Sequence, residues 1–358
     1  MVKLLYIIFG QGLVIINWGI IATGTIADKF ARTVKAMESE GERLVAVGSR
    51  DKGKAEAFAE KYGVKKAYGT YEELAADTEV EAVYIATPNN LHFDNTMLCL
   101  AAGKHVLCEK PFTTSAKQAE MLHRIADSKG LFVMEAFWIR FLPLYEELLK
   151  IIESKQFGEL RHARSDYGFI ATGDRRTKKF LPELGGGALL DIGVYNLGFL
   201  RMIMGSDPEN FTTDVRFSEF GTDEFSVVQL RYPGGKTAQC LQTIGLQIER
   251  RAALYFDKAT VYLPDFQGAY SMTVKPLDGE PYEVSLPADI NGFEYQIRET
   301  TKCIKAGKTR SEIFTPEDSI ATIRLMDEIR ASWDMRFPFE LTPEQLAQEL
   351  SVDKNAEM

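Results

Sequence analysis

The chain has 358 residues, 45% of them hydrophobic and 26% charged, and this length favours two domains over a single core. Its 42 basic and 51 acidic residues give a net charge of −9, which excludes the general basic surface of a nucleic-acid-binding or lipid-surface protein. The four cysteines form no CxxC pair and there are only four histidines, so we expect reduced thiols, a cytoplasmic location and no metal site.

Residues 1–16, MVKLLYIIFGQGLVII, are apolar apart from one lysine and look somewhat like a secretory signal peptide. No A-x-A cleavage pattern follows, and the apolar run continues directly into the strand that the next motif requires. We therefore interpret this run as an extra leading segment or a misplaced start, with secretion as the open alternative. No other segment reaches the length of a membrane span, so we expect no membrane association.

Strands and helices alternate through residues 1–137, which we interpret as a nucleotide-binding domain. Asp51 stands where a helix N-cap is expected, and Gly63 stands where that helix would stop. Alternation with nearly continuous apolar strands predicts an α/β domain with a doubly wound parallel sheet of the Rossmann type. The expected strands are 15–21, 43–49, 81–87, 104–108 and 131–134, and the expected helices are 25–37, 51–63, 91–103 and 115–130.

The pattern changes after residue 137. Successive strand-like runs are separated by Gly and Pro at hairpin spacing, and helical segments flank them on both sides. We expect residues 138–340 to form an α+β domain with a large, mainly antiparallel open sheet, and 341–358 to be a polar tail. The expected helices are 143–154, 190–205, 292–307 and 316–333, and the expected strands are 223–233, 235–245, 250–256, 259–264, 270–276 and 282–287.

The segment GIIATGTIA, residues 19–27, follows the first strand and opens the first helix, where a dinucleotide-binding fingerprint belongs. Gly24 would let the backbone approach a pyrophosphate, whose charge the free N–H groups of the helix start would bind. Ala22 replaces the first glycine of the fingerprint, and the alternative is a plain strand-turn-helix connection. The cofactor-binding residues predicted here are Gly19, Ala22, Thr23, Gly24, Thr25 and Ile26.

The residue at the end of the second strand distinguishes NAD from NADP in this type of domain, because an acidic side chain there binds the ribose 2′-OH of NAD. This chain has Ser49 and Arg50 at that position instead. A hydroxyl and a guanidinium suit a 2′-phosphate, so NADP(H) is preferred and NAD(H) is possible. The alternative is that Arg50 is a solvated surface residue.

Two further segments end strands at the same carboxyl edge of the sheet. IATPNNLH ends the strand at 81–87, and CEKP ends the strand at 104–108. Ligands bind in the crevice at this edge of open α/β sheets. The cofactor-lining residues predicted here are Thr87, Pro88, Asn89, His92, Glu109 and Lys110, although His92 also fits a plain helix start.

Lys110 and Tyr195 are the expected catalytic pair. Lys110 ends a parallel strand and is followed by a proline, and Tyr195 shares a helical face with Asp191 four residues earlier. The glycines at 185–187 would let that helix begin close to a ligand. The alternatives are an exposed loop lysine and a core tyrosine.

With these residues in place, the chain resembles the Gfo/Idh/MocA oxidoreductase family from Ile16 to Glu340. GIIATGTIA, TYEELAAD, IATPNNLH, AAGKHVLCEKP and GGGALLDIGVYNLGF carry the resemblance. VLCEKP and MEAFWIRF are similar to the branch of dimeric dihydrodiol dehydrogenase and NADP-dependent xylose dehydrogenases. That branch often lacks the glycine that Ala22 replaces, and it has tyrosine at the position of Tyr195, where many members have histidine.

The resemblance implies a Rossmann domain followed by an open-sheet domain whose exposed face forms a dimer. It implies Lys110 and Tyr195 as catalytic residues with Asp191 beside them, and it places Trp138 and Arg140 on the substrate side. The chain would then be an NADP-dependent dehydrogenase acting on a small sugar-like, cyclic polyol or dihydrodiol substrate. Two alternatives stay open: a cofactor-sensing regulator without chemistry, and a carbohydrate lyase or glycosidase that uses NAD transiently.

Assembly can also be predicted from the second domain. If helices cover one face of its sheet, the other face would expose apolar residues such as Val227, Leu230 and Leu241. Large exposed apolar faces mark interfaces, so we expect a homodimer or a dimer of dimers.

Overall fold

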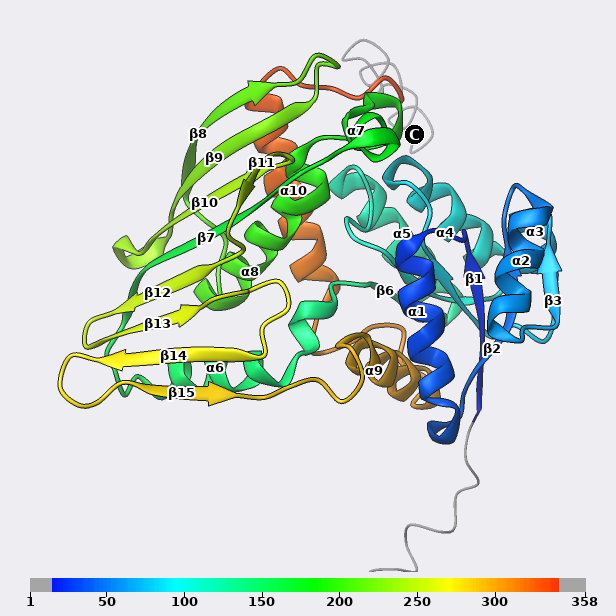
Figure 1. Cartoon of the computed structure of the whole chain (residues 1–358), viewed down its shortest axis with the longest axis horizontal. Helices are drawn as coiled ribbons and strands as arrows, with labels where there is room; N and C mark the ends of the chain where they lie inside the picture. The colour runs from blue at the N-terminus through cyan, green and yellow to red at the C-terminus, as the bar shows by residue number, and fades with distance from the viewer. Residues whose placement is uncertain (1–14, 341–358) are drawn as a thin grey trace, which may run out of the picture.

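The computed structural model describes residues 15–340, apart from the side chain of Arg175. The expectations for an apolar leading segment and for a polar tail therefore fall largely or wholly outside the described residues. Two sheets lie side by side, with two C-terminal helices between them (Figure 1).

The first sheet has six parallel strands in the order β3-β2-β1-β4-β5-β6. The order reverses between β1 and β4, which is the switch point where doubly wound sheets bind ligands. This confirms the predicted Rossmann-type sheet. The strands are β1 Ile16–Ile21, β2 Glu42–Gly48, β3 Lys66–Tyr68, β4 Ala82–Ile85, β5 His105–Cys108 and β6 Val133–Glu135, and the helices are α1 Thr25–Ala36, α2 Lys52–Tyr62, α3 Tyr71–Ala76, α4 His92–Ala101 and α5 Ala116–Lys129.

Local signals fixed the ends of α2. The Asp51 carboxylate accepts a hydrogen bond from the Lys54 backbone N–H, as an N-cap should, and Gly63 ends the helix in the left-handed conformation at φ 67°. The short strand β3 and helix α3 between α2 and β4 were not predicted as elements, because three and six residues carry too little periodicity.

The second sheet has nine strands in the order β15-β14-β13-β12-β7-β10-β9-β8, with β11 also pairing with β7. Within the described part of this second sheet only β7 and β10 pair in parallel, so the predicted mainly antiparallel sheet is confirmed. The strands are β7 Leu160–Ile170, β8 Asn210–Phe217, β9 Asp223–Arg231, β10 Thr237–Thr243, β11 Gly245–Ile248, β12 Ala252–Phe256, β13 Ala259–Leu263, β14 Ser271–Pro276 and β15 Tyr282–Ser285.

Helix α8, Val194–Met204, and the π-helical turn Leu189–Gly193 before it cover one face of this sheet at β7 and β10. The expectation that no other segment reaches the length of a membrane span is wrong. The apolar segment Pro182–Met204 is long enough to cross a membrane by length and composition, but 83% of its most apolar window is buried inside the protein. It is therefore a core element of the second half of the chain. The neighbouring helices are α6 Pro143–Ser154 and α7 Gly173–Phe180.

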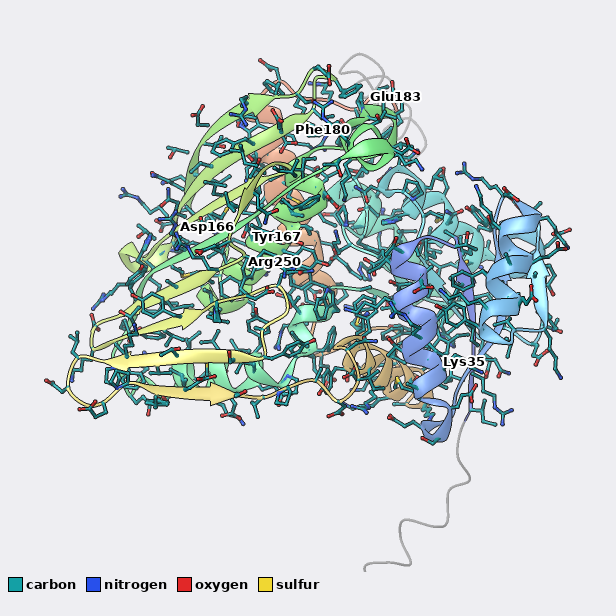
Figure 2. All side chains as sticks on the ribbon, viewed as in Figure 1. Lys35, Asp166, Tyr167, Phe180, Glu183 and Arg250 are labelled. Carbon is teal, nitrogen blue, oxygen red and sulfur yellow. The ribbon has the colours of Figure 1, made fainter. Side chains whose placement is uncertain are left out.

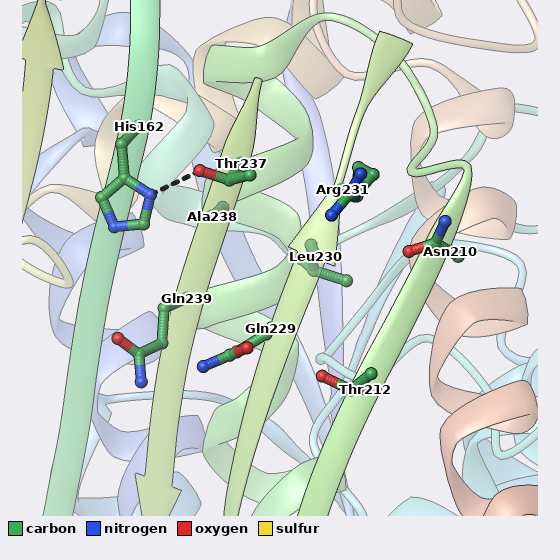
Figure 3. Close-up of a pocket in the computed structure, with 9 residues that line it drawn as sticks. All are labelled: His162, Asn210, Thr212, Gln229, Leu230, Arg231, Thr237, Ala238 and Gln239. Atoms are coloured by element: carbon green, nitrogen blue, oxygen red, sulfur yellow. Dashed lines mark hydrogen bonds between the residues drawn. The ribbon is translucent and has the colours of Figure 1, made fainter. Parts of the chain in front are cut away.

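The prediction that Leu230 lies on the uncovered face is wrong. Val227 and Leu230 are three residues apart on β9, and alternation puts them on opposite faces. Leu230 is 2% exposed, whereas Val227 pairs with Leu241 on the open face. The open face is more polar than expected: His162 Nδ1 lies 2.9 Å from Thr237 Oγ1 there, and Gln229, Gln239 and Thr212 line the same hollow (Figure 3).

Helices α9, Phe293–Lys305, and α10, Pro316–Ser332, return to the first sheet instead of only closing the second (Figure 1). Thr301 of α9 donates a hydrogen bond to the buried Glu42 of β2, whose other carboxylate oxygen accepts from Trp18 Nε1. α10 packs between α5 and α8. Through these contacts α9 and α10 pack the second half of the chain against the first. Helix α8 of the second half is thereby held next to the first sheet.

Candidate active site

The helix start of α1 offers a cradle for a charged ligand. Gly24 is its N-cap, and no side chain caps the first free N–H groups. A Cβ built on Gly24 would meet no atom within 4 Å, so no contact inside the protein requires glycine there. An approaching ligand would require it, and this fits a pyrophosphate on the helix N-terminus. Thr23, Thr25 and Ile26 border the same turn and are exposed or partly exposed.

Ala22 occupies the position of the missing first glycine in a glycine-like conformation. Its φ of 84° lies in the region that favours glycine, and its N–H donates to the Gly48 carbonyl at the end of β2. Gly19 has a different role from the one predicted by the fingerprint. It lies inside β1, where an added Cβ would come within 3.1 Å of Leu74 and Val80.

Ser49 and Arg50 follow β2 at the same edge. Ser49 is buried, and its hydroxyl accepts a hydrogen bond from the Asp51 backbone N–H at 3.3 Å. Arg50 is exposed and lies near Tyr71, where its charge opposes the rise in the Tyr71 pKa caused by burial. The guanidinium is therefore the group at this position that can reach a ligand.

The segment after β4 joins the fingerprint edge to the glycine-rich stretch. Asn89 Nδ2 donates to the Gly185 carbonyl at 2.9 Å, so residues 96 positions apart meet. Pro88 precedes Asn89 at this edge, and Thr87 accepts a hydrogen bond from Asn95.

His92 is 1% exposed, and its two ring nitrogens lie 2.8 and 2.9 Å from the carbonyl oxygens of Pro111 and Thr87. It thus ties the segment after β4 to the segment that carries Lys110. Burial lowers the pKa of His92, while both carbonyl contacts oppose that shift.

Lys110 lies at the end of β5, as predicted, and precedes Pro111 through a cis peptide bond. Its side chain is 14% exposed, so it can be reached from outside. The neighbouring Glu109 is buried and accepts hydrogen bonds from the Tyr84 hydroxyl and the Lys110 N–H. Burial raises the pKa of Glu109, and the positive charge of Lys110 opposes this.

Asp191 orients Lys110. Lys110 Nζ donates to the Asp191 backbone carbonyl at 2.6 Å and lies 3.6 Å from its Oδ1. Lys179 of α7 pairs with the other carboxylate oxygen. Burial alone would raise the Asp191 pKa, but the two ammonium groups outweigh it and the pKa is lowered. Asp191 therefore stays ionised and holds Lys110 in place.

The ring of Tyr195 contacts the ammonium group of Lys110. It is 4% exposed, and Lys110 Nζ lies 4.9 Å from its ring centroid. Its hydroxyl accepts a hydrogen bond from Trp138 Nε1 at 3.1 Å. Burial raises the pKa of Tyr195, Glu109 adds to this rise, and the Trp138 hydrogen bond opposes it. The side chains of the protein thus hold Tyr195 in its neutral form, as a proton donor.

Trp138 and Arg140 do not share a site. Trp138 is buried against Tyr195, whereas Arg140 lines a separate cavity of about 240 Å³ with Arg201 and Asp318. The ring of Phe137 borders that cavity and stacks on Tyr195, so it lies between the two. The short 3-10 turn at 138–141 explains the split, because it turns residues two apart to different sides.

Three contributors to the site were missed by sequence reasoning: Lys179, Tyr167 and Lys29. Lys179 lies in α7, a helix that was not predicted from the sequence, and it pairs with Asp191. The Tyr167 ring centroid is 6.1 Å from that of Tyr195, and Tyr167 lies beside Arg250 (Figure 2). Lys29 places its Nζ 4.2 Å from the centroid of the Trp138 ring. None of these contacts leaves a local sequence signal.

Both halves of the chain match models of the same protein family. The family described as "Oxidoreductase family, NAD-binding Rossmann fold" matches residues 16–137, and the GFO/IDH/MocA C-terminal domain matches residues 145–262. Trans-1,2-dihydrobenzene-1,2-diol dehydrogenase of Mus musculus is 34% identical over 332 residues, covering 90% of this chain and 98% of its own. The Homo sapiens enzyme of that name is also 34% identical, with the same coverage.

Solved structures that are similar along most of the chain include a ketoreductase and an aldose oxidoreductase. A 3-ketoreductase from Actinomadura kijaniata, in complex with NADP and TDP-benzene, is 27% identical with a TM-score of 0.79, covering 88% of this chain and 97% of its own. An aldose-aldose oxidoreductase from Caulobacter crescentus is 27% identical with a TM-score of 0.80, covering 90% and 98%. With both halves matched and relatives above 30% identity over nine-tenths of its length, the chain belongs to the Gfo/Idh/MocA family of oxidoreductases.

Proposed function

We propose that this protein is an NADP-dependent dehydrogenase that oxidises a secondary hydroxyl of a sugar-like, cyclic polyol or dihydrodiol substrate, or reduces the corresponding carbonyl. The observation that carries the proposal is the convergence of Lys110, Asp191 and Tyr195 at the carboxyl edge that also bears Gly24. The relatives supply the substrate class, since they are dihydrodiol and aldose oxidoreductases.

NADP(H), held at the helix start by Gly24 and at the end of β2 by Arg50, would supply the hydride chemistry at the substrate carbon. Tyr195 Oη would take the hydroxyl proton during oxidation and return it during reduction. Lys110, held by Asp191, would donate to the substrate oxygen as charge develops there. Because burial raises the pKa of Tyr195, nearby positive charge is needed for it to act as a base, and Lys110 supplies one such charge.

Substrate class is tested by measuring NADPH formation across a panel of aldoses, inositols and trans-dihydrodiols. We expect turnover with at least one class and none with NADP alone. Absence of turnover across the panel, together with tight NADP binding, would contradict the proposal and favour the cofactor-sensing regulator.

Arg50 is expected to select NADP over NAD. Replacing Arg50 with alanine should weaken NADP binding by about 1–3 kcal/mol, because a charge-assisted contact to the 2′-phosphate is lost, and should leave NAD binding nearly unchanged. Titration calorimetry with both cofactors measures this. The matched control is Arg43→Ala, at the opposite end of β2, which should change neither affinity. Equal losses for both cofactors, or a wild-type preference for NAD, would contradict the assignment.

We also propose that residues 1–137 bind the cofactor, that residues 138–340 supply the substrate and subunit contacts, and that the enzyme works in the cytoplasm. All four cysteines are buried and unpaired, which suits a reducing compartment.

A homodimer or dimer of dimers should form through the open face of the second sheet. Tyr255 and Tyr262 on this face are 37% and 39% exposed, and Val227 and Leu241 add apolar surface. Light scattering at micromolar concentration should give at least twice the chain mass. Tyr262→Glu should lower the measured mass toward that of the monomer, while Lys35→Met on α1 should leave the measured mass unchanged. A monomeric wild-type protein would contradict this.

A further inference from the structure

Lys29 lies between the two halves of the molecule with its charge directed at aromatic rings. It belongs to α1, the helix whose N-terminus forms the proposed phosphate cradle. Its Nζ lies 4.2 Å from the centroid of the Trp138 ring and 4.0 Å from that of Phe293. Within residues 15–340, no carboxylate lies within ion-pair distance of it. The ammonium is therefore in direct contact with two π faces, and Glu109 and Glu294 act on its charge from a longer distance.

The indole that Lys29 contacts is the hydrogen-bond donor to Tyr195. Trp138 is 5% exposed, and its Nε1 donates to Tyr195 Oη at 3.1 Å. The indole also packs closely on Gly292, where an added Cβ would lie only 2.7 Å from Trp138 Cζ3. The indole therefore packs on the backbone of Gly292, contacts the Lys29 ammonium through its ring, and donates its N–H to Tyr195.

We infer that Lys29 is a positioning residue for the proton-carrying tyrosine: its ammonium group holds the Trp138 indole in the orientation in which Nε1 donates to Tyr195 Oη. A hydrogen bond donated to a phenolate favours the phenolate, and a cation on the indole face strengthens the N–H as a donor. The inference deepens the proposed function and rests on it, because it assigns Tyr195 the proton transfer.

A purely structural role for Lys29 is the competing explanation. An apolar side chain of similar length would fill the same space without the cost of a desolvated charge. That cost is visible in the pKa of Lys29, which is lowered from 10.5 to about 8: burial is the main cause, Glu109 and Glu294 oppose the shift, and Arg32 of the same helix adds to it. The ammonium is thus present below that pH and lost above it. Titration of Lys29 therefore separates the two explanations.

The first experiment does not depend on turnover. In protein labelled with nitrogen isotope at tryptophan, the three tryptophans give three indole N–H signals, and the one missing from Trp138→Phe belongs to Trp138. We expect this signal to shift with a midpoint near pH 8 in the wild type and to lose that transition in Lys29→Met. Lys35→Met, on the exposed face of the same helix (Figure 2), should keep it. A Trp138 signal identical in wild type and Lys29→Met across this range would overturn the inference.

The second experiment uses the reaction itself. Lys29→Met should lower kcat for oxidation by about 3- to 30-fold, the range of a cation–π contact that is partly desolvated, with the NADP Kd near wild type. Lys29→Arg should restore most of the loss, and Lys29→Met should add nothing to Tyr195→Phe. An unchanged kcat, or the same fractional loss in the Tyr195→Phe background, would overturn the inference. If no variant and no wild type turns over, the proposed function fails, and the indole signal still decides the placement of Lys29.

Discussion

Tyr195→Phe should lower turnover by about 10²- to 10⁴-fold while NADP affinity stays near wild type. The substitution keeps the ring, so its packing against Phe137 and Tyr167 remains, and it removes only the hydroxyl that accepts from Trp138. The loss is expected in kcat because the proton must move in the transition state. Steady-state kinetics and cofactor titration on the same preparation measure both quantities.

The competing account makes Tyr195 a core residue whose hydroxyl is satisfied by Trp138. It predicts near-normal turnover and a modest fall in melting temperature, since an indole N–H would lose its acceptor. Trp138→Phe is the matched variant, because it breaks the same hydrogen bond from the other side and leaves the tyrosine hydroxyl in place. Turnover close to wild type in Tyr195→Phe would remove Tyr195 from the mechanism.

Lys110→Met should be at least as damaging as Tyr195→Phe, so a loss of about 10²- to 10⁴-fold or more is expected in kcat. The methionine keeps most of the aliphatic stem but removes both the donor to the substrate oxygen and the cation near the Tyr195 ring. It also leaves Asp191 with Lys179 as its remaining ammonium partner. Kinetics with saturating NADP separate this loss from a change in cofactor binding.

The matched control for Lys110 is Lys179→Met. Lys179 pairs with the same carboxylate but is not expected to touch the substrate oxygen, so its loss should be smaller. The double variant Lys110→Met, Tyr195→Phe should be little worse than either single variant, because residues that act as a unit are not additive. Multiplicative losses in the double variant would show that the two residues act independently and would contradict the shared site.

The sequence by itself determined the architecture of this protein. Strand-helix alternation up to residue 137 and hairpin spacing after it are local patterns, and both sheets follow from them. The ends of α2 were fixed by Asp51 and Gly63, since capping and a left-handed stop act within one turn. The family motifs named Lys110 and Tyr195, and the structure places their side chains together.

Only the tertiary structure decided which groups surround that pair. Lys179 reaches Asp191 from α7, and Lys29 reaches Trp138 from α1, through side-chain contacts between segments that no periodicity relates. The same holds for Arg140, which lies two positions after Trp138 in a 3-10 turn and lines a different cavity.

The face of a strand is the other property that packing decided. Alternation requires Val227 and Leu230 to lie on opposite faces, but both are apolar, so the sequence does not say which face the helices cover. Helix α8 covers one face of β7 and β10; Leu230, which pairs with Ala238 of β10, is buried, and Val227 lies on the open side. Hydrophobic period is a local quantity, whereas the choice of covered face depends on where a helix distant in sequence docks.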